Sequence, residues 1–82
     1  MKLPRDLSGH DLASRLERLG YVVTRQTGSH LRLTTQQGGE HHVTIPAHEA
    51  LRVGTLSAVL EMVAAHFKTE RTSLVELLFG KH

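Results

Sequence analysis

The residues of this 82-residue chain that are best suited to chemistry are its seven histidines, one of which follows a tight turn. Imidazole, with an unperturbed pKa of about 6.5, can accept and donate protons near neutral pH. Gly28, Ser29 and His30 form this turn and open a predicted strand. Glycine lets a backbone approach a phosphate closely, serine offers a hydroxyl, and His30 can transfer a proton. The same tripeptide also suits an ordinary solvated turn.

Two arginines flank this turn in the sequence. Arg25 and Arg32 carry planar guanidinium groups, which bind phosphate oxygens through fork-shaped pairs of hydrogen bonds. With Gly28, Ser29 and His30 they make up the candidate phosphate-binding set. The residue types therefore indicate a site for a phosphate-bearing ligand.

Four histidines, His30, His41, His42 and His48, raise the alternative of a zinc site. Zinc sites usually show closely spaced Cys and His ligands, and the chain has no Cys. Adjacent strand residues also point to opposite faces of a sheet, which separates His41 from His42. Scattered surface histidines are the simpler interpretation, and we expect no bound metal.

The first element that must position these groups is a helix over residues 8–19. Ser8 is a suitable N-cap, Asp11 three residues later resembles a capping box, and Gly20 supplies a left-handed stop. Three leucines repeat on one helical face: Leu12, Leu16 and Leu19.

Three strands are predicted next, over residues 21–26, 29–35 and 42–45, because turn residues divide the runs and Pro46 ends the last one. In the second and third strands apolar and polar residues alternate. The apolar residues should face a core, and the opposite face should stay open to solvent. That open face is expected to carry His30, Arg32, Thr34, His42 and Thr44.

Two more helices complete the predicted chain. Thr55 is the expected cap of the second helix, whose apolar stripe is Leu56, Val59, Leu60, Val63 and Phe67. Such a stripe usually packs in the core, although a docking groove for a partner helix is an alternative. Ser73 and Glu76 form a capping-box pattern ahead of a short third helix that Gly80 ends. The predicted class is α+β, with helices covering one face of an antiparallel sheet.

The composition excludes several classes of protein. Hydrophobic residues make up 39% and charged residues 22%, so we expect one folded domain over residues 1–82 rather than disorder. The net charge of +2 does not by itself indicate nucleic acid, and the lack of Cys excludes disulfides and thiolate chemistry. No apolar run approaches the ~20 residues of a membrane helix, and no signal peptide is recognisable. We expect a cytoplasmic protein.

The arrangement of these motifs resembles the HicA family of toxins from toxin-antitoxin modules, from about Leu7 to Leu78. Its most specific element is the Gly-Ser-His turn between the first helix and the Ile-Pro-Ala-His and Gly-Thr-Leu blocks. The family commonly has a second histidine or an aromatic residue where this chain has Leu31. The matching segments are Ser8-Gly9-His10-Asp11-Leu12, Leu19-Gly20-Tyr21, Arg25-Gln26-Thr27-Gly28-Ser29-His30, Val43-Thr44-Ile45-Pro46-Ala47-His48 and Gly54-Thr55-Leu56-Ser57-Ala58-Val59-Leu60.

The resemblance implies a fold like that of double-stranded-RNA-binding domains, α-β-β-β-α with a short extra C-terminal helix. It also implies an endoribonuclease that cuts mRNA, has His30 as its catalytic histidine and is silenced by a HicB-type antitoxin. The 2′-hydroxyl of RNA can serve as nucleophile, so a base suffices and no metal or other cofactor is expected. His48, His42 or water are the candidate acids. A non-catalytic RNA-binding module and a pure protein-interaction domain are the alternative functions.

Overall fold

The structure is a computed structural model, and it describes residues 6–80. Its order is helix, three antiparallel strands and two helices, as predicted, which is an α-β-β-β-α arrangement like that of double-stranded-RNA-binding domains. The elements are α1 (Gly9–Leu16), the 3₁₀ turn η1 (Glu17–Leu19), β1 (Val22–Thr27), β2 (His30–Thr35), β3 (His41–Pro46), α2 (Val53–Phe67) and α3 (Arg71–Phe79).

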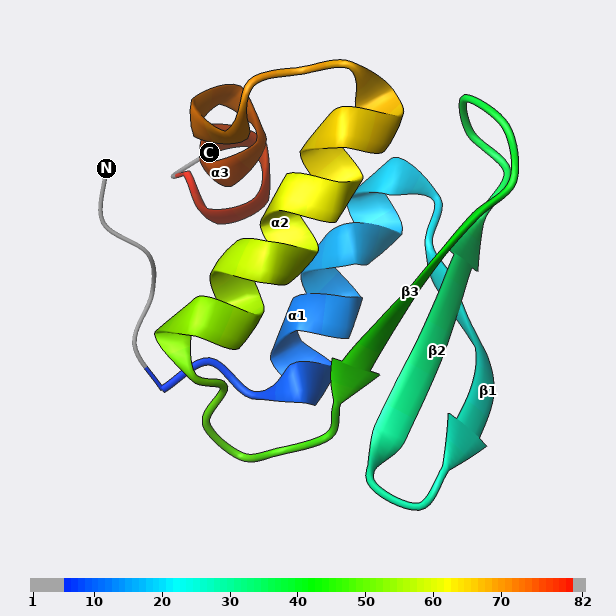
Figure 1. The fold of residues 1–82 in the computed structure, drawn as a ribbon, viewed down its shortest axis with the longest axis vertical. Helices are drawn as coiled ribbons and strands as arrows, with labels where there is room; N and C mark the ends of the chain where they lie inside the picture. The colour runs from blue at the N-terminus through cyan, green and yellow to red at the C-terminus, as the bar shows by residue number, and fades with distance from the viewer. Residues whose placement is uncertain (1–5, 81–82) are drawn as a thin grey trace.

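The three strands form one antiparallel sheet in the order β1-β2-β3. Helices α1 and α2 lie side by side against one face of this sheet, and α3 packs against both helices at a distance from the strands (Figure 1). Within residues 6–80 the opposite face of the sheet carries no helix, as the alternation of apolar and polar residues predicted. The fold thus presents one bare sheet surface, which we call the open face.

The core lies between the sheet and the helices. Alternate residues of β2 and β3 point into it, and Leu33 and Ile45 are completely buried. The apolar stripe of α2 faces the same interior, so its interpretation as a core stripe rather than a docking groove is confirmed. The fully buried helix residues include Leu12, Leu16, Leu60, Val63 and Leu78.

Burial of these side chains stabilises the fold because each apolar residue removed from water contributes roughly 1.5–3 kcal/mol before the cost of ordering the chain. Strand β1 lies beyond the cover of the helices, and all six of its residues are exposed.

The predicted start of α1 is confirmed. The Ser8 hydroxyl accepts from the Asp11 backbone N–H, and the Asp11 carboxylate accepts from the Ser8 backbone N–H, which completes a capping box. Gly20 ends this segment in the left-handed conformation, with φ of 82°.

The predicted caps of the other helices were wrong. Helix α2 begins at Val53 with Arg52 as its N-cap, so Thr55 lies inside the first turn. Helix α3 begins at Arg71 with Glu70 as its N-cap, so Ser73 also lies within the helix. Neither start has a side-chain cap, and the first turn of α2 is closed by the Leu56 N–H donating to the Arg52 carbonyl. Side-chain capping signals cannot locate a helix whose start is set by backbone bonds and packing.

Two smaller expectations also need correction. Strand β1 runs one residue later than predicted, because Tyr21 is buried beneath the sheet instead of pairing in it. Thr34 points to the open face but is only 8% exposed, because its neighbours on both adjacent strands cover it. Within residues 6–80 no helix is long and apolar enough to cross a membrane.

Candidate functional site

The strand register arranges the open face as three rows that run across the sheet. Directly paired residues of antiparallel strands point to the same face, so each row is a set of neighbours. The rows are about 7 Å apart, since neighbouring rows are two residues apart at ~3.3 Å per residue along β2. The first row is Thr27, His30 and Pro46, the second is Arg25, Arg32 and Thr44, and the third is Val22, Thr34 and His42.

His30 stands at the edge of the sheet, where the turn between β1 and β2 ends. Gly28 opens this turn with a φ of 54°, a backbone conformation that favours glycine. A Cβ atom at this position would contact no other atom, so the turn needs glycine for its backbone conformation and not for space. The imidazole of His30 is exposed, and no hydrogen bond or ion pair engages it within the described part of the chain. Both ring nitrogens are therefore available to a ligand.

Backbone contacts hold the surroundings of His30 in place. The Ala47 N–H donates to the Ser29 carbonyl at 2.6 Å, which fixes the turn against the end of β3. The Gly9 N–H donates to the His48 carbonyl at 3.0 Å, which brings the start of α1 to the same place. A Cβ atom on Gly9 would collide with the Pro46 carbonyl, so this close approach requires glycine. Three sequence segments thus meet at the His30 end of the sheet.

The second row places two arginines side by side. Arg25 and Arg32 are direct cross-strand partners, and both are exposed. Like charges in directly opposite positions destabilise a sheet by about 0.2–1 kcal/mol. Among the ion pairs of residues 6–80, neither guanidinium has a carboxylate partner. An anion between these two groups would relieve the repulsion, so this row is suited to a phosphate.

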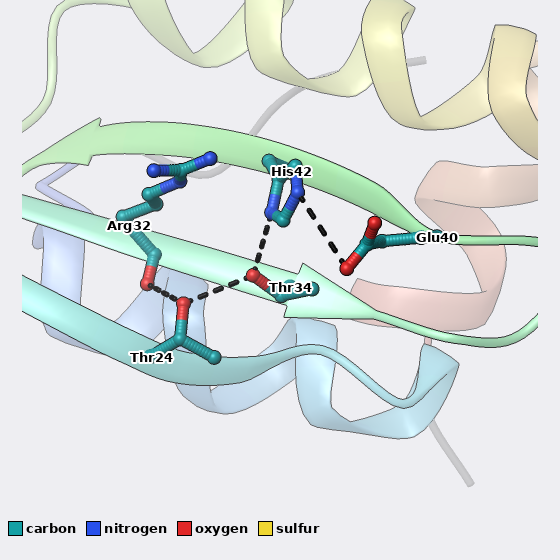
Figure 2. A network of polar contacts seen from close by, with 5 residues as sticks. All are labelled: Thr24, Arg32, Thr34, Glu40 and His42. Atoms are coloured by element: carbon teal, nitrogen blue, oxygen red, sulfur yellow. Dashed lines mark hydrogen bonds and ion pairs between the residues drawn. The ribbon is translucent and has the colours of Figure 1, made fainter.

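The third row contains a chain of hydrogen bonds (Figure 2). Thr24 donates to the Arg32 carbonyl at 3.3 Å and lies 2.9 Å from the Thr34 hydroxyl, which lies 2.7 Å from His42 Nδ1. Since each hydroxyl has one proton, all three bonds form together only if His42 Nδ1 carries a proton and Thr34 donates to Thr24. Glu40 lies 3.9 Å from the other ring nitrogen of His42. These side chains therefore hold one another in fixed positions.

A second cluster of histidines, not predicted from the sequence, lies at the same end of the molecule as the third row. The rings of His41 and His66 stack at 4.3 Å, and His66 Nε2 donates to the Gln37 carbonyl at 2.9 Å. His41 Nδ1 lies 2.7 Å from the Tyr21 hydroxyl. Burial raises the pKa of Tyr21 to about 12, so the phenol keeps its proton and can donate it to His41.

The pKa of His41 lies below its usual value, mainly because burial disfavours the charged ring. Charge repulsion from the nearby His66 and His42 lowers this pKa further. The neutral form of His41 is consequently favoured, which agrees with a ring nitrogen that accepts a hydrogen bond. His41 and His66 are thus engaged in packing. The stacking of His41 in β3 on His66 in α2 leaves no periodic pattern in the sequence that could have predicted it.

The structure separates the sequence-predicted residues into two groups. Gly28, Ser29 and His30 occupy one end of the open face, with Arg25 and Arg32 in the adjacent row and the His48 backbone nearby. His42 lies four residues further along the sheet, about 13 Å from the His30 row at ~3.3 Å per residue. His42 is therefore too remote to share a phosphate with His30, and the four histidines considered for zinc do not converge. Among residues 6–80 no group of three potential ligands is placed to hold a metal ion.

A family model described as the HicA toxin of bacterial toxin-antitoxin systems matches residues 9–63, which is more than half of the chain. The chain belongs to the HicA toxin family. No curated protein and no solved structure gives a significant match. The HicA match begins with α1 and ends within α2, so it contains the whole sheet and all three rows, while α3 lies outside it.

Membership of the HicA family makes this chain the toxin type of component in a toxin-antitoxin system, a class that acts generally on RNA and is paired with an antitoxin. The positions that sequence reasoning missed in this HicA-family chain are Thr24 and the Tyr21, His41 and His66 cluster. Thr24 was missed because a bulge between Val23 and Arg25 shifts the register of β1 there.

Proposed function

We propose that this chain is the toxin of a type II toxin-antitoxin module and that it cleaves mRNA without a metal ion, using His30 as the general base. The single observation that carries the proposal is the pairing of an exposed, unengaged His30 with the adjacent row of two arginines that lack carboxylate partners. The two rows are about 7 Å apart, and arginine side chains are long, so His30 and the arginine pair can act on the same phosphodiester. The family match supports an RNA target of this kind.

The chemistry needs only groups that RNA and these residues supply. His30 removes the proton of a 2′-hydroxyl, and the oxygen attacks the adjacent phosphorus. The bond from phosphorus to the 5′-oxygen then breaks, which leaves a 2′,3′-cyclic phosphate and a free 5′-hydroxyl. Arg25 and Arg32 stabilise the charge that grows on the non-bridging oxygens, while Gly28 and Ser29 shape the turn that admits the phosphate.

A proton donor for the leaving oxygen must lie at the His30 end of the sheet. His48 qualifies by position, because its backbone is joined to the start of α1 beside the end of β3 and its side chain is exposed. Water is the remaining donor. His42 lies in the third row, too far from His30 to protonate the leaving oxygen.

Product analysis tests the proposal. Purified chain, incubated with a single-stranded RNA in EDTA, should give fragments that end in a 2′,3′-cyclic phosphate or its 3′-phosphate hydrolysis product, and DNA of the same sequence should survive. Mass spectrometry of the fragments distinguishes the outcomes. Fragments with 3′-hydroxyl ends would contradict attack by the 2′-hydroxyl. Binding without any cleavage would favour a non-catalytic RNA-binding module.

The antitoxin in this proposal is a HicB-type protein that covers the open face. Burying Arg25 and Arg32 without partners would leave charges desolvated, so acidic residues of the antitoxin should lie opposite them. Added antitoxin should therefore release bound RNA in proportion to the complex formed, and its association rate should fall as salt rises. A stable complex of toxin, antitoxin and RNA would contradict inhibition by occlusion.

A further inference from the structure

The open face is hollowed beside its third row. A hollow of about 420 Å³ is lined by Gly20, Val22, Thr24, Thr34, Gln36 and Gln37. This volume falls in the range of roughly 300–1,000 Å³ that is typical of small-molecule sites. The hollow lies at the opposite end of β2 from His30, so it is separate from the proposed reaction centre.

The strands and the loop that frame the hollow are held in place before any ligand arrives. Thr24 and Thr34 belong to the hydrogen-bond chain that ends at His42. Behind them the buried Thr35 hydroxyl donates to the Leu19 carbonyl at 2.7 Å and accepts from the Gln37 N–H at 3.1 Å. The loop after β2 is thereby attached to the turn after α1. A fixed frame reduces the entropy that a ligand must offset on binding.

The lining is neutral and capable of hydrogen bonding in both directions. The side-chain amides of Gln36 and Gln37 each offer donors and an acceptor, and no hydrogen bond to another side chain occupies them within residues 6–80. Gly20 has no side chain, and the Gln37 amide lies close over it. Val22, which is 56% exposed, adds an apolar wall.

These properties select one class of ligand. No charged residue lines the hollow, so it is unsuited to a phosphate or a metal ion. Its walls are open to solvent and include polar groups, so it is equally unsuited to a lipid chain. A planar heterocycle with hydrogen-bonding edges fits both the amides and the apolar wall, and unstacked bases of single-stranded RNA are read through such contacts.

We propose that this hollow binds an unpaired nucleobase of the RNA and so gives the protein a sequence preference. The inference rests on the proposed function, since the base belongs to the strand whose phosphate meets His30. The hollow lies about 13 Å from the His30 row, and the two arginines stand between them. An RNA strand running along β2 meets the base site, the phosphate-binding row and the catalytic histidine in that order.

Binding to short homopolymers tests the base site apart from catalysis. His30→Ala serves as the parent, so that RNA is not consumed, and fluorescence anisotropy gives its affinity for labelled adenine, cytosine and uracil homopolymers. Gln36→Ala with Gln37→Ala is the test variant. Gln26→Ala is the matched control, because Gln26 is an exposed glutamine of β1 that does not line the hollow. Circular dichroism confirms that each variant is folded.

The parent and the Gln26→Ala control should prefer one homopolymer over the weakest by about tenfold, and the double variant should bind all three to within about twofold. The salt dependence of binding should be the same in all three proteins, because no phosphate contact is removed. An unchanged preference in the double variant, or no preference in the parent, overturns the base site while leaving the proposed function standing. Absence of RNA binding by every protein overturns both.

Discussion

The two ends of the sheet have histidines in opposite situations. At one end His30 is exposed and unengaged, and backbone hydrogen bonds alone fix its surroundings. At the other end His41 and His66 stack on each other and use ring nitrogens in hydrogen bonds, while His42 joins two threonines. In the proposed function, the same residue type therefore contributes chemistry at one end and structure at the other.

A small sheet can leave a side chain free for proton transfer when the backbone holds the surroundings of that side chain in place. A histidine whose nitrogens are already bonded, and whose pKa burial lowers, is poorly placed to exchange protons with a substrate. At the His30 end the main chain does the positioning, through Gly9, Ser29 and Ala47, so the imidazole has no structural task.

The largest effect is expected from Gly9→Ala, which attacks the backbone support of the His30 end. The new Cβ would collide with the Pro46 carbonyl, so α1 and β3 must separate. We expect a loss of about 1–3 kcal/mol in the free energy of unfolding, measured by urea denaturation. Gly54→Ala is the matched control, because it meets open space in α2 and should stabilise by up to about 1 kcal/mol. Equal effects of the two changes would contradict the close approach.

Thr34→Val attacks the side-chain support of the opposite end. It removes the hydroxyl that joins Thr24 to His42 without changing the side-chain shape, and it leaves both partners short of a hydrogen bond. The free energy of unfolding should fall by about 1–2 kcal/mol. Thr44→Val, at an exposed position of the second row, should change it by less than about 0.5 kcal/mol. A Thr34→Val protein as stable as its control would show that the hydrogen-bond chain does not support this end.

The pH dependence of stability should reveal the packed histidines. The pKa of His41 is lowered in the folded chain, so the unfolded chain binds more protons as pH falls below about 6.5. Stability is thus highest above that pH and decreases on acidification until the folded pKa is passed. The midpoint of thermal unfolding should drop between about pH 7.5 and about pH 5.5, and less so in His41→Gln. Parallel pH profiles of the two proteins would exclude His41 as the source.

The smallest effect on stability, with the opposite sign, is expected from Arg32→Ala. Removing one member of the cross-strand arginine pair relieves repulsion, so the free energy of unfolding should rise by about 0.2–1 kcal/mol. RNA affinity should fall evenly across sequences, and the slope of log affinity against log salt should shrink by about 1. Lys68→Ala removes one positive charge at the residue that follows α2, outside the sheet, and so controls for a general effect of charge. If the salt dependence of RNA affinity shrinks equally in both variants, the second row does not bind a phosphate.

Much of this organisation could be predicted from the sequence because it is local and periodic. Alternation in β2 and β3 predicted which residues face the core, and Ser8 with Asp11 predicted the start of α1. The starts of α2 and α3 could not be predicted in that way, since backbone bonds and packing set them.

Long-range features were also out of reach. The stacking of His41 on His66 joins β3 to the end of α2, and no spacing rule connects these residues. The bulge at Thr24 gives that residue its place beside Thr34, and the hollow exists only once the loop after β2 is attached to Leu19. Sequence patterns proposed His30 and its arginines as candidates and placed Thr34 and His42 on the open face, whereas the hydrogen-bond chain through Thr24 required the fold.

In the proposed function His30 performs the chemistry and the packed histidines do not, so the cleavage rates of single-residue variants separate the two. RNA cleavage in EDTA should be compared for the unmodified chain, His30→Ala and His66→Ala at a temperature where all three are folded. His30→Ala should lower the rate about 100- to 10,000-fold with an unchanged melting temperature. His66→Ala should lower the melting temperature yet keep the rate within a few-fold. A His30→Ala protein that cleaves as fast as the unmodified chain would contradict the account.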